Sequence, residues 1–269
     1  MMTISGIGKY ITLFSHTSIN ITSNDDFSSH LHNTNEILLF IQGDAEYTID
    51  DRKYLLKPYD LLIIPAGTYH NLTPNTYGLY ENYVINFKDD FLSSNQLKAL
   101  LSQPHVFNVY NDKTLMHNFK QFDLCYEGYS EEDFVDAVEC GLKQTLLHCI
   151  YSQKISSAEI ERKAPIINST INYINENLAS ELNANIIASA LNVSASHLQN
   201  LFSKHMKIGL KQYIVQKKII AVSSEVKNGC TIIEASSKFG FTDYSTFYRQ
   251  YKKLFGSSPF ELKKNNGVK

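Results

Sequence analysis

The chain contains 269 residues with a formal net charge of −2; 43% are hydrophobic and 19% are charged, a composition typical of folded globular proteins rather than disordered ones. No apolar run approaches the roughly 18 residues that cross a membrane, the first residues lack the pattern of a signal peptide, and four scattered cysteines argue against a disulfide framework. We therefore expect a soluble cytoplasmic protein of two domains, because a domain usually spans about 100–200 residues.

The first third of the chain predicts an antiparallel β-structure. Short apolar or alternating runs follow one another from about residue 9 to residue 87, and turn residues separate them. Closely spaced strands of this kind are typical of a sandwich or a barrel. The predicted strands are Tyr10–Phe14, Glu36–Gln42, Ala45–Ile49, Tyr54–Leu56, Leu61–Ile64 and Tyr77–Phe87.

Histidine and glutamate residues recur within this region in a distinctive pattern. His30 and His32 are two residues apart, Glu36 follows, and His70 ends the run Pro65–His70. Residues two apart share one face of a strand, so these four side chains could converge inside a small barrel. The pattern resembles both motifs of cupin barrels, although Asp60 with Tyr59 before it stands where the second motif usually opens on glycine.

Three interpretations of this group stay open. It could bind a metal, because imidazole and carboxylate ligands suit Fe, Mn, Ni or Zn. It could line a pocket for an effector, or it could be a set of ordinary histidines that bond to backbone. We assign no metal and no cofactor. The candidate effector pocket consists of His30, His32, Glu36, Tyr47 and His70. If a metal is bound, its candidate ligands are His30, His32, Glu36 and His70.

A helical pattern replaces the strand pattern from about residue 90 to residue 152. Within residues 131–152 the apolar positions recur every three to four residues and form one stripe. This stripe could pack on the barrel or form a dimer interface, and the pattern does not distinguish the two. A polar stretch then predicts a linker at residues 153–164. The stripe consists of Val135, Val138, Leu142 and Leu146.

The remainder of the chain is basic and contains an internal repeat. Residues 161–269 hold 15 Lys and Arg against 7 Asp and Glu, whereas residues 1–160 hold 10 against 20, so the second half favours an anionic partner. Residues 186–206 and 232–256 each predict a short helix, a turn and a second helix, with Ser196 and Ser245 at equivalent positions. A long helix at about residues 210–227 would connect the two units.

The second helix of each unit has the properties of a helix that enters DNA. An α-helix fits the major groove of a duplex, where small polar side chains contact base edges and lysines contact phosphates. Two such helices could enter successive major grooves, which lie about 34 Å apart.

The run IIEASSKFGFTDYSTFYRQYKKLFGSSPFEL at residues 232–262 resembles the signature of AraC/XylS-type transcription regulators. The resemblance covers about 100 residues and implies a DNA-binding domain with two helix-turn-helix motifs at residues 165–264. Departures from the family pattern are Lys207 in place of a turn glycine, Asn200 in place of an arginine, and Lys218 in place of another arginine. The resemblance implies base contacts by Ser196, Gln199, Asn200, Ser245, Thr246 and Arg249, and phosphate contacts by Lys204, Lys252 and Lys253.

The sequence thus predicts an α+β protein of two parts. Residues 1–152 form a cupin-like sensor and dimerisation domain, with the barrel at about 9–87 and helices at about 90–152, and an all-α domain follows the linker. The predicted function is sequence-specific transcription regulation in a bacterium, without enzyme activity, under control of a small molecule in the barrel. Expected partners are double-stranded DNA, the effector, a second copy bound through the N-terminal domain, and RNA polymerase; we expect no membrane association.

Two alternatives of other classes stay open. The first is a metal-binding cupin enzyme fused to a DNA-binding module. The second is an effector-independent regulator whose barrel serves only dimerisation.

Overall fold

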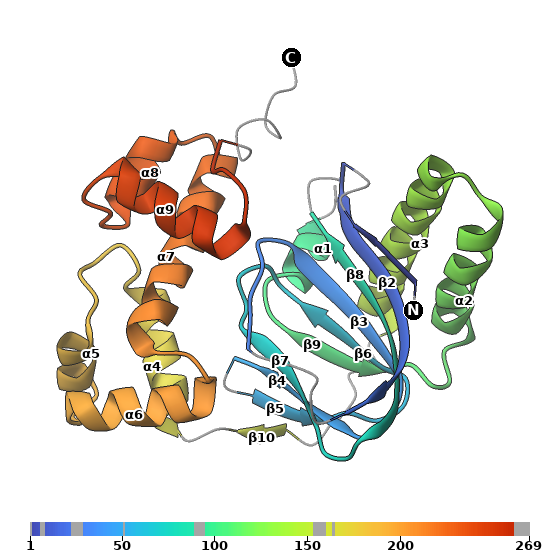
Figure 1. The fold of residues 1–269 in the computed structure, drawn as a ribbon, viewed down its shortest axis with the longest axis horizontal. Helices are drawn as coiled ribbons and strands as arrows, with labels where there is room; N and C mark the ends of the chain where they lie inside the picture. The colour runs from blue at the N-terminus through green and yellow to red at the C-terminus, as the bar shows by residue number, and fades with distance from the viewer. Residues whose placement is uncertain are drawn as a thin grey trace. The chain divides into compact units, whose positions relative to one another are not determined.

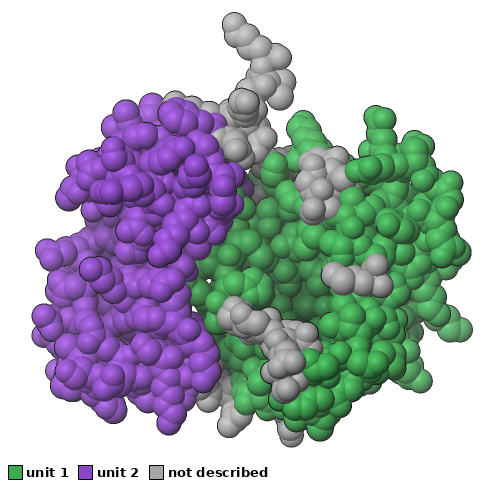
Figure 2. Space-filling view, viewed as in Figure 1, with its two compact units in different colours: residues 1–161 green, residues 162–269 purple. Residues whose placement is uncertain are grey.

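The computed structural model describes residues 2–5, 9–22, 29–50, 52–88, 95–152, 160–162 and 165–260. The chain divides into two compact units, residues 1–161 and residues 162–269 (Figures 1 and 2). Most of the predicted linker 153–164 lies outside the described residues, and its described part, Ile160–Arg162, forms strand β10. Among the described residues, no helix is long and apolar enough to cross a membrane.

The described residues of the first unit form two β-sheets (Figure 1), in which β2–β8, β8–β3, β3–β6 and β4–β7 pair antiparallel. The six-stranded sheet has the order β1 (Met2–Ser5), β2 (Ile11–Ile21), β8 (Gly78–Phe87), β3 (Asn35–Gln42), β6 (Asp60–Ile64) and β9 (His105–Asn108). The four-stranded sheet has the order β10, β5 (Arg52–Leu55), β4 (Ala45–Ile49) and β7 (His70–Pro74).

The six-stranded sheet is buried on both faces. Because side chains alternate along a strand, Ile37 and Leu39 of β3 point into one hydrophobic core, while Leu38 and Phe40 point into a second core shared with the four-stranded sheet. This burial on both faces explains why β3 and β6 have nearly continuous apolar sequences instead of an alternating pattern.

The described part of the first unit contains three helices, and two of them form a long antiparallel pair (Figure 1). They are α1 (Asn95–Leu100), α2 (Lys113–Gly128) and α3 (Glu131–Ser152). Val138, Leu142 and Leu146 of the predicted stripe lie in the core beside the six-stranded sheet, and Val135 is also buried. Next to the stripe, Phe134 meets the ring of Phe14 edge-on at 5.1 Å. The stripe therefore faces the sheet, which resolves the choice that the sequence left open.

The expectation of helices throughout residues 90–152 needs one correction. Strand β9 lies inside this range and pairs with β6. Its two central residues separate onto opposite faces of the sheet, Val106 into one core and Phe107 into the other. A strand of four residues is too short to show a period of two against the helical pattern around it.

A histidine attaches α2 to the sheet. The His16 ring lies between two carboxylates, with Nδ1 3.0 Å from Asp123 of α2 and Nε2 3.0 Å from Glu81 of β8. The Tyr83 hydroxyl donates to the other oxygen of Asp123 at 2.5 Å. These partners are far from His16 along the chain, so no local sequence pattern indicates the contact.

The second unit is helical, and its elements match the repeat in the sequence. Its helices are α4 (Pro165–Glu176), α5 (Ala184–Ala190), α6 (Ala195–Met206), α7 (Leu210–Lys227), α8 (Ile232–Lys238) and α9 (Tyr244–Phe255). The Ser194 and Asp243 side chains cap α6 and α9 by accepting hydrogen bonds from backbone N–H groups, as is usual at helix N-termini.

Lys207 ends α6 in the left-handed conformation that Gly256 adopts at the end of α9. The φ angles are 57° and 71°, and each residue donates its backbone N–H to a carbonyl four residues earlier, at 3.0 Å and 2.9 Å. The first helix-turn-helix of the repeat therefore ends in the same left-handed turn as the second, although a residue with a Cβ is strained in this conformation.

We expect Lys207→Gly to raise the free energy of unfolding by about 0.5–1 kcal/mol, because it removes this Cβ from a left-handed position. The midpoint of urea unfolding of the full chain, followed by helical circular dichroism, measures the change. Lys204→Gly, inside the same helix, is the matched control and should lower stability by about 1 kcal/mol. Equal losses in both variants would contradict the strain at Lys207.

Candidate functional site

The second helix of each repeat exposes the side chains that the sequence predicts. In α6, Leu198 and Phe202 are buried, which leaves the opposite face in solvent. In α9, Phe247 and Tyr251 are buried in the same way. Of the nine residues predicted to contact DNA, those that are exposed are Ser196, Gln199, Asn200, Lys204, Ser245, Arg249, Lys252 and Lys253.

Thr246 is the exception, because its hydroxyl is engaged within the protein. This hydroxyl donates to Asp243 Oδ2 at 2.8 Å and accepts a long hydrogen bond from Arg249 at 3.4 Å. The residue is only half-exposed. Thr246 therefore takes part in the N-terminal cap of α9, and a base contact would have to compete with the cap.

Both exposed helices line one cavity of about 660 Å³. Ser196 and Gln199 of α6 contribute to its wall, and so do Thr246 and Gln250 of α9. Because α6 and α9 border the same hollow, their polar side chains face a common space. Asn200 and Arg249 do not line this cavity, although both are exposed.

The connecting helix α7 supplies two cations to the same cavity, Lys211 and Lys218. The Lys218 ammonium donates to the Ser180 carbonyl at 3.0 Å, and partial burial lowers its pKa. Neither Lys211 nor Gln250 is among the nine residues predicted to contact DNA. The charge of Lys211 and the outward position of Gln250 on α9 are the only sequence signals for them.

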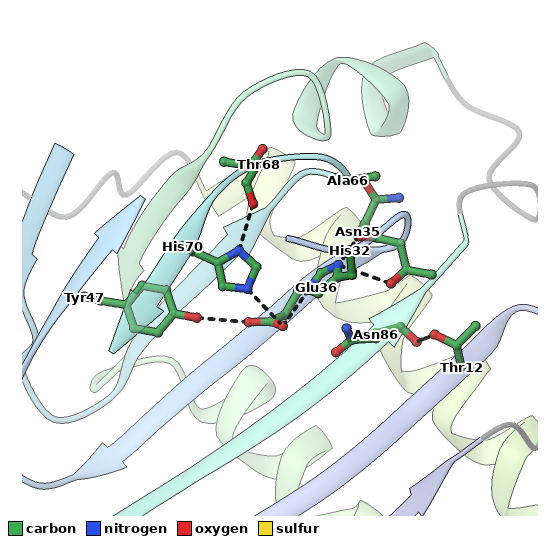
Figure 3. Close-up of polar contacts among 10 residues, drawn as sticks. Thr12, His32, Asn35, Glu36, Tyr47, Ala66, Thr68, His70 and Asn86 are labelled. Carbon is green, nitrogen blue, oxygen red and sulfur yellow. Dashed lines mark hydrogen bonds and ion pairs between the residues drawn. The ribbon is translucent and has the colours of Figure 1, made fainter. Parts of the chain in front are cut away.

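A second polar cluster lies inside the first unit, and it gathers the histidines and the glutamate of the motif (Figure 3). Glu36 is on β3, His70 begins β7, and His32 precedes β3. Glu36 Oε2 is 3.0 Å from His32 Nε2 and 3.7 Å from His70 Nε2. The alternation that buries Leu38 and Phe40 also directs Glu36 into this interior.

Tyr47 and His30 complete the predicted group. The Tyr47 hydroxyl donates to Glu36 Oε1 at 3.2 Å, and its ring is stacked 6.0 Å from the His70 ring (Figure 3). His30 is exposed, with its ring centre 4.4 Å from that of His70, and backbone hydrogen bonds of 3.0 and 3.1 Å link the two residues. The structure thus brings together all five residues that the sequence assigns to the effector pocket.

The electrostatics of the cluster follow from burial and from the single carboxylate. Burial alone would raise the pKa of Glu36, but the neighbouring histidines, His70 first, outweigh it and lower this pKa to about 2. Burial lowers the pKa of His70 to about 4, despite the opposing charge of Glu36. Burial also opposes a charge on His32, but its hydrogen bond to Glu36 and the charge of Glu36 raise the pKa of His32.

We expect the buried His70 to make the protein lose stability between pH 6.5 and pH 4.5. The unfolded chain binds a proton at His70 below its ordinary pKa of 6.5, whereas the folded chain does so only near pH 4, so the slope reaches about 1.4 kcal/mol per pH unit. Chelator-treated protein unfolded in urea at several pH values measures it. His70→Gln should flatten the slope in this window, and His117→Gln on the exposed side of α2 should not; an equal slope in wild type and His70→Gln would contradict the assignment.

Each of the two units matches a known family of protein domains. A model described as a helix-turn-helix domain matches residues 187–265, and a model described as an AraC-like ligand binding domain matches residues 17–139. The uncharacterized HTH-type transcriptional regulator YfiF of Bacillus subtilis is 23% identical over 265 residues, which cover 93% of this chain and 83% of that protein.

Shorter or weaker similarities accompany these. The Msm operon regulatory protein of Streptococcus mutans is 32% identical over 99 residues, 36% of each chain. The crystal structure of ToxT from Vibrio cholerae aligns over 95% of this chain and 99% of ToxT, with 16% identity and a TM-score of 0.43. On the two matched domains and the full-length relative, the chain belongs to the AraC family of DNA-binding transcription regulators, with an N-terminal ligand-binding domain and a C-terminal helix-turn-helix domain.

Proposed function

We propose that this regulator binds DNA by inserting α6 and α9 into successive major grooves of one duplex. The supporting observation is that both helices bury their apolar faces against the second unit and expose polar faces on a shared cavity. Arg249 is the strongest candidate for sequence discrimination, because a guanidinium can form two hydrogen bonds with guanine. Gln199 and Asn200 on α6 have the matching geometry for adenine.

The electrostatic part of binding comes from lysines beside these residues. Lys252 and Lys253 lie in the last turn of α9, and Lys204 lies in the last turn of α6. Each ammonium that neutralises a phosphate releases a condensed counterion, so it adds affinity that depends on salt and not on sequence. These three lysines thus hold the helices against the duplex while the other side chains contact bases.

The first unit is proposed to control DNA binding through an effector bound at the His32, Glu36, His70 and Tyr47 cluster. The cluster has the composition of a binding site, because a few convergent polar groups lie within an apolar interior. An effector changes DNA affinity only by the difference in its affinity for the two states of the regulator. The relatives are regulators, and we propose that this chain acts in the bacterial cytoplasm without catalysis.

We further propose that two copies associate through the outer face of α2 and α3. With its apolar stripe buried against the sheet, α3 still exposes Cys140, Leu147 and Tyr151, which recur at helical spacing. Leu124 of α2 is 59% exposed and Tyr151 is 72% exposed. Apolar side chains gathered on one helical pair are typical of an association surface. RNA polymerase is a further proposed partner of the DNA-bound dimer.

We expect Arg249→Ala to weaken specific DNA binding by about 1–3 kcal/mol and to relax the preference at one base pair. Selection of bound duplexes from a random pool supplies the preferred site, and titration against single-base variants of that site measures the change. Ser257→Ala, beyond the end of α9, serves as the comparison. A loss that is equal for all duplexes would contradict base recognition by Arg249.

We expect Lys253→Ala to weaken binding to every duplex alike. The slope of log affinity against log salt concentration should fall by about one, because one phosphate contact is lost. Lys120→Ala on α2 removes the same charge from the first unit and should leave the slope unchanged. An unaltered slope in Lys253→Ala would show that this lysine does not contact phosphate.

A further inference from the structure

The tautomers of two histidines are fixed by backbone carbonyls. His32 Nδ1 lies 2.7 Å from the Thr34 carbonyl. His70 Nδ1 lies 2.9 Å from the Thr68 carbonyl (Figure 3). A carbonyl oxygen only accepts hydrogen bonds, so both Nδ1 atoms must carry hydrogens. In each ring Nε2 is then the nitrogen left for a ligand, and both Nε2 atoms face Glu36. His32 Nε2 donates a hydrogen bond to Glu36 Oε2 at 3.0 Å, so it must release this hydrogen when a metal binds.

His70 Nε2 lacks a hydrogen-bond partner among the described residues, although it is shielded from solvent. His70 as a whole is 1% exposed. A buried polar atom without a partner is costly and uncommon in folded proteins, and such an atom often marks a site for an ion or a ligand. Glu36 Oε2, at 3.7 Å, is too far to satisfy it. A species placed between Glu36 and His70 would satisfy it.

The donor atoms are close enough to share one metal ion. The ligand atoms of His32, Glu36 and His70 all lie within 4.8 Å of one another. Neighbouring donors on a first-row metal lie about 3.0–3.5 Å apart, because each bond is about 2.0–2.2 Å long. The separations of 3.0 and 3.7 Å from Glu36 Oε2 are close to this range, so small side-chain movements would suffice.

The surroundings support the same interpretation. Histidines that bind metals usually donate their other ring N–H to a carbonyl or a carboxylate, which fixes the orientation of the ring; His32 and His70 both do so. Tyr47 holds the second oxygen of Glu36 through its hydroxyl. His30 lies at the exposed side of the cluster, with its ring centre 4.4 Å from that of His70.

We propose that the first unit binds one divalent first-row transition metal ion through His32 Nε2, His70 Nε2 and Glu36, and that this ion changes the DNA affinity of the regulator. Two imidazoles and one carboxylate favour Fe, Ni, Co or Zn over Mg or Ca, which prefer oxygen ligands alone. The effect of the ion on DNA affinity rests on the proposed effector role of the cluster, whereas metal binding itself does not. The sequence assigned no metal but kept one as an interpretation of this group, and the direction of the two Nε2 atoms is what favours that interpretation here.

The direct test is a titration of the untagged, chelator-treated full chain with Ni²⁺ by calorimetry, together with the visible absorption of added Co²⁺. We expect one ion per chain and absorption bands of nitrogen and oxygen coordination. Glu36→Gln and His32→Gln should each abolish stoichiometric binding, and His117→Gln should retain it. No stoichiometric binding to the wild type, or the same binding in both site variants, would overturn the proposal.

Tyr47→Phe tests whether Tyr47 positions the ligand Glu36 without binding the metal itself. Removal of an outer partner of a metal ligand usually weakens metal binding about 10–100-fold, so we expect one ion per chain with an affinity reduced by about that factor. Circular dichroism of each variant identifies a loss of folding, and Tyr47→Phe, which keeps the aromatic ring, tests the site even if Glu36→Gln does not fold. An affinity equal to that of the wild type would contradict the role of Tyr47.

DNA titrations with and without Ni²⁺ test whether the bound ion changes the DNA affinity of the regulator. We expect the DNA affinity of the wild type to change at least fivefold with the ion and that of Glu36→Gln to stay constant. Stoichiometric metal binding with unchanged DNA affinity would overturn the effector role alone. Failure of both forms to bind any DNA would instead refute the proposed function, and the calorimetric result would still decide whether the metal site exists.

Discussion

The burial of the six-stranded sheet on both faces is the constraint on which the first unit depends. Strand β3 must present apolar side chains to the helices on one face and to the four-stranded sheet on the other. The alternation then leaves no choice for Glu36, which shares a face with Leu38 and Phe40 and enters the interior as a carboxylate. An isolated buried carboxylate is costly, and the three histidines around Glu36 offset this cost by lowering its pKa.

The second unit depends on a similar division between faces. Leu198 and Phe202 fix the rotation of α6 about its axis, and Phe247 and Tyr251 fix that of α9. The rotation of each helix determines which of its side chains are exposed. The polar face of each helix therefore has a defined orientation without contacts of its own. The caps at Ser194 and Asp243 set where each helix begins, and therefore which residues lie in its first turn.

Much of this architecture could be predicted from the sequence, for particular physical reasons. The bounds of α6 and α7 were predictable because a capping serine, the helical period and the turn at Lys207 agree with one another. His30, His32, Glu36 and His70 of the proposed effector cluster were predictable as a set because their spacing is cupin-like, although His32 lies in the segment before β3 and not on a strand. Strand β9 was not, since four residues inside a helical pattern carry too little periodic signal, and the contact of His16 with Asp123 was not, since it joins segments 107 residues apart. The tautomers of His32 and His70 also depend on backbone carbonyls whose positions only the fold defines.

The shared use of Thr246 by the cap of α9 has a consequence for how such a regulator diverges. A substitution at Thr246 alters the start of the helix and its outer surface together, because the same hydroxyl bonds to Asp243 and to Arg249. Ser245 does not have this double role, because it is exposed and does not supply the capping side chain. Within the proposed mode of DNA binding, a change at Ser245 would therefore alter the outer surface of α9 and leave its N-terminal cap intact, whereas a change at Thr246 would alter both.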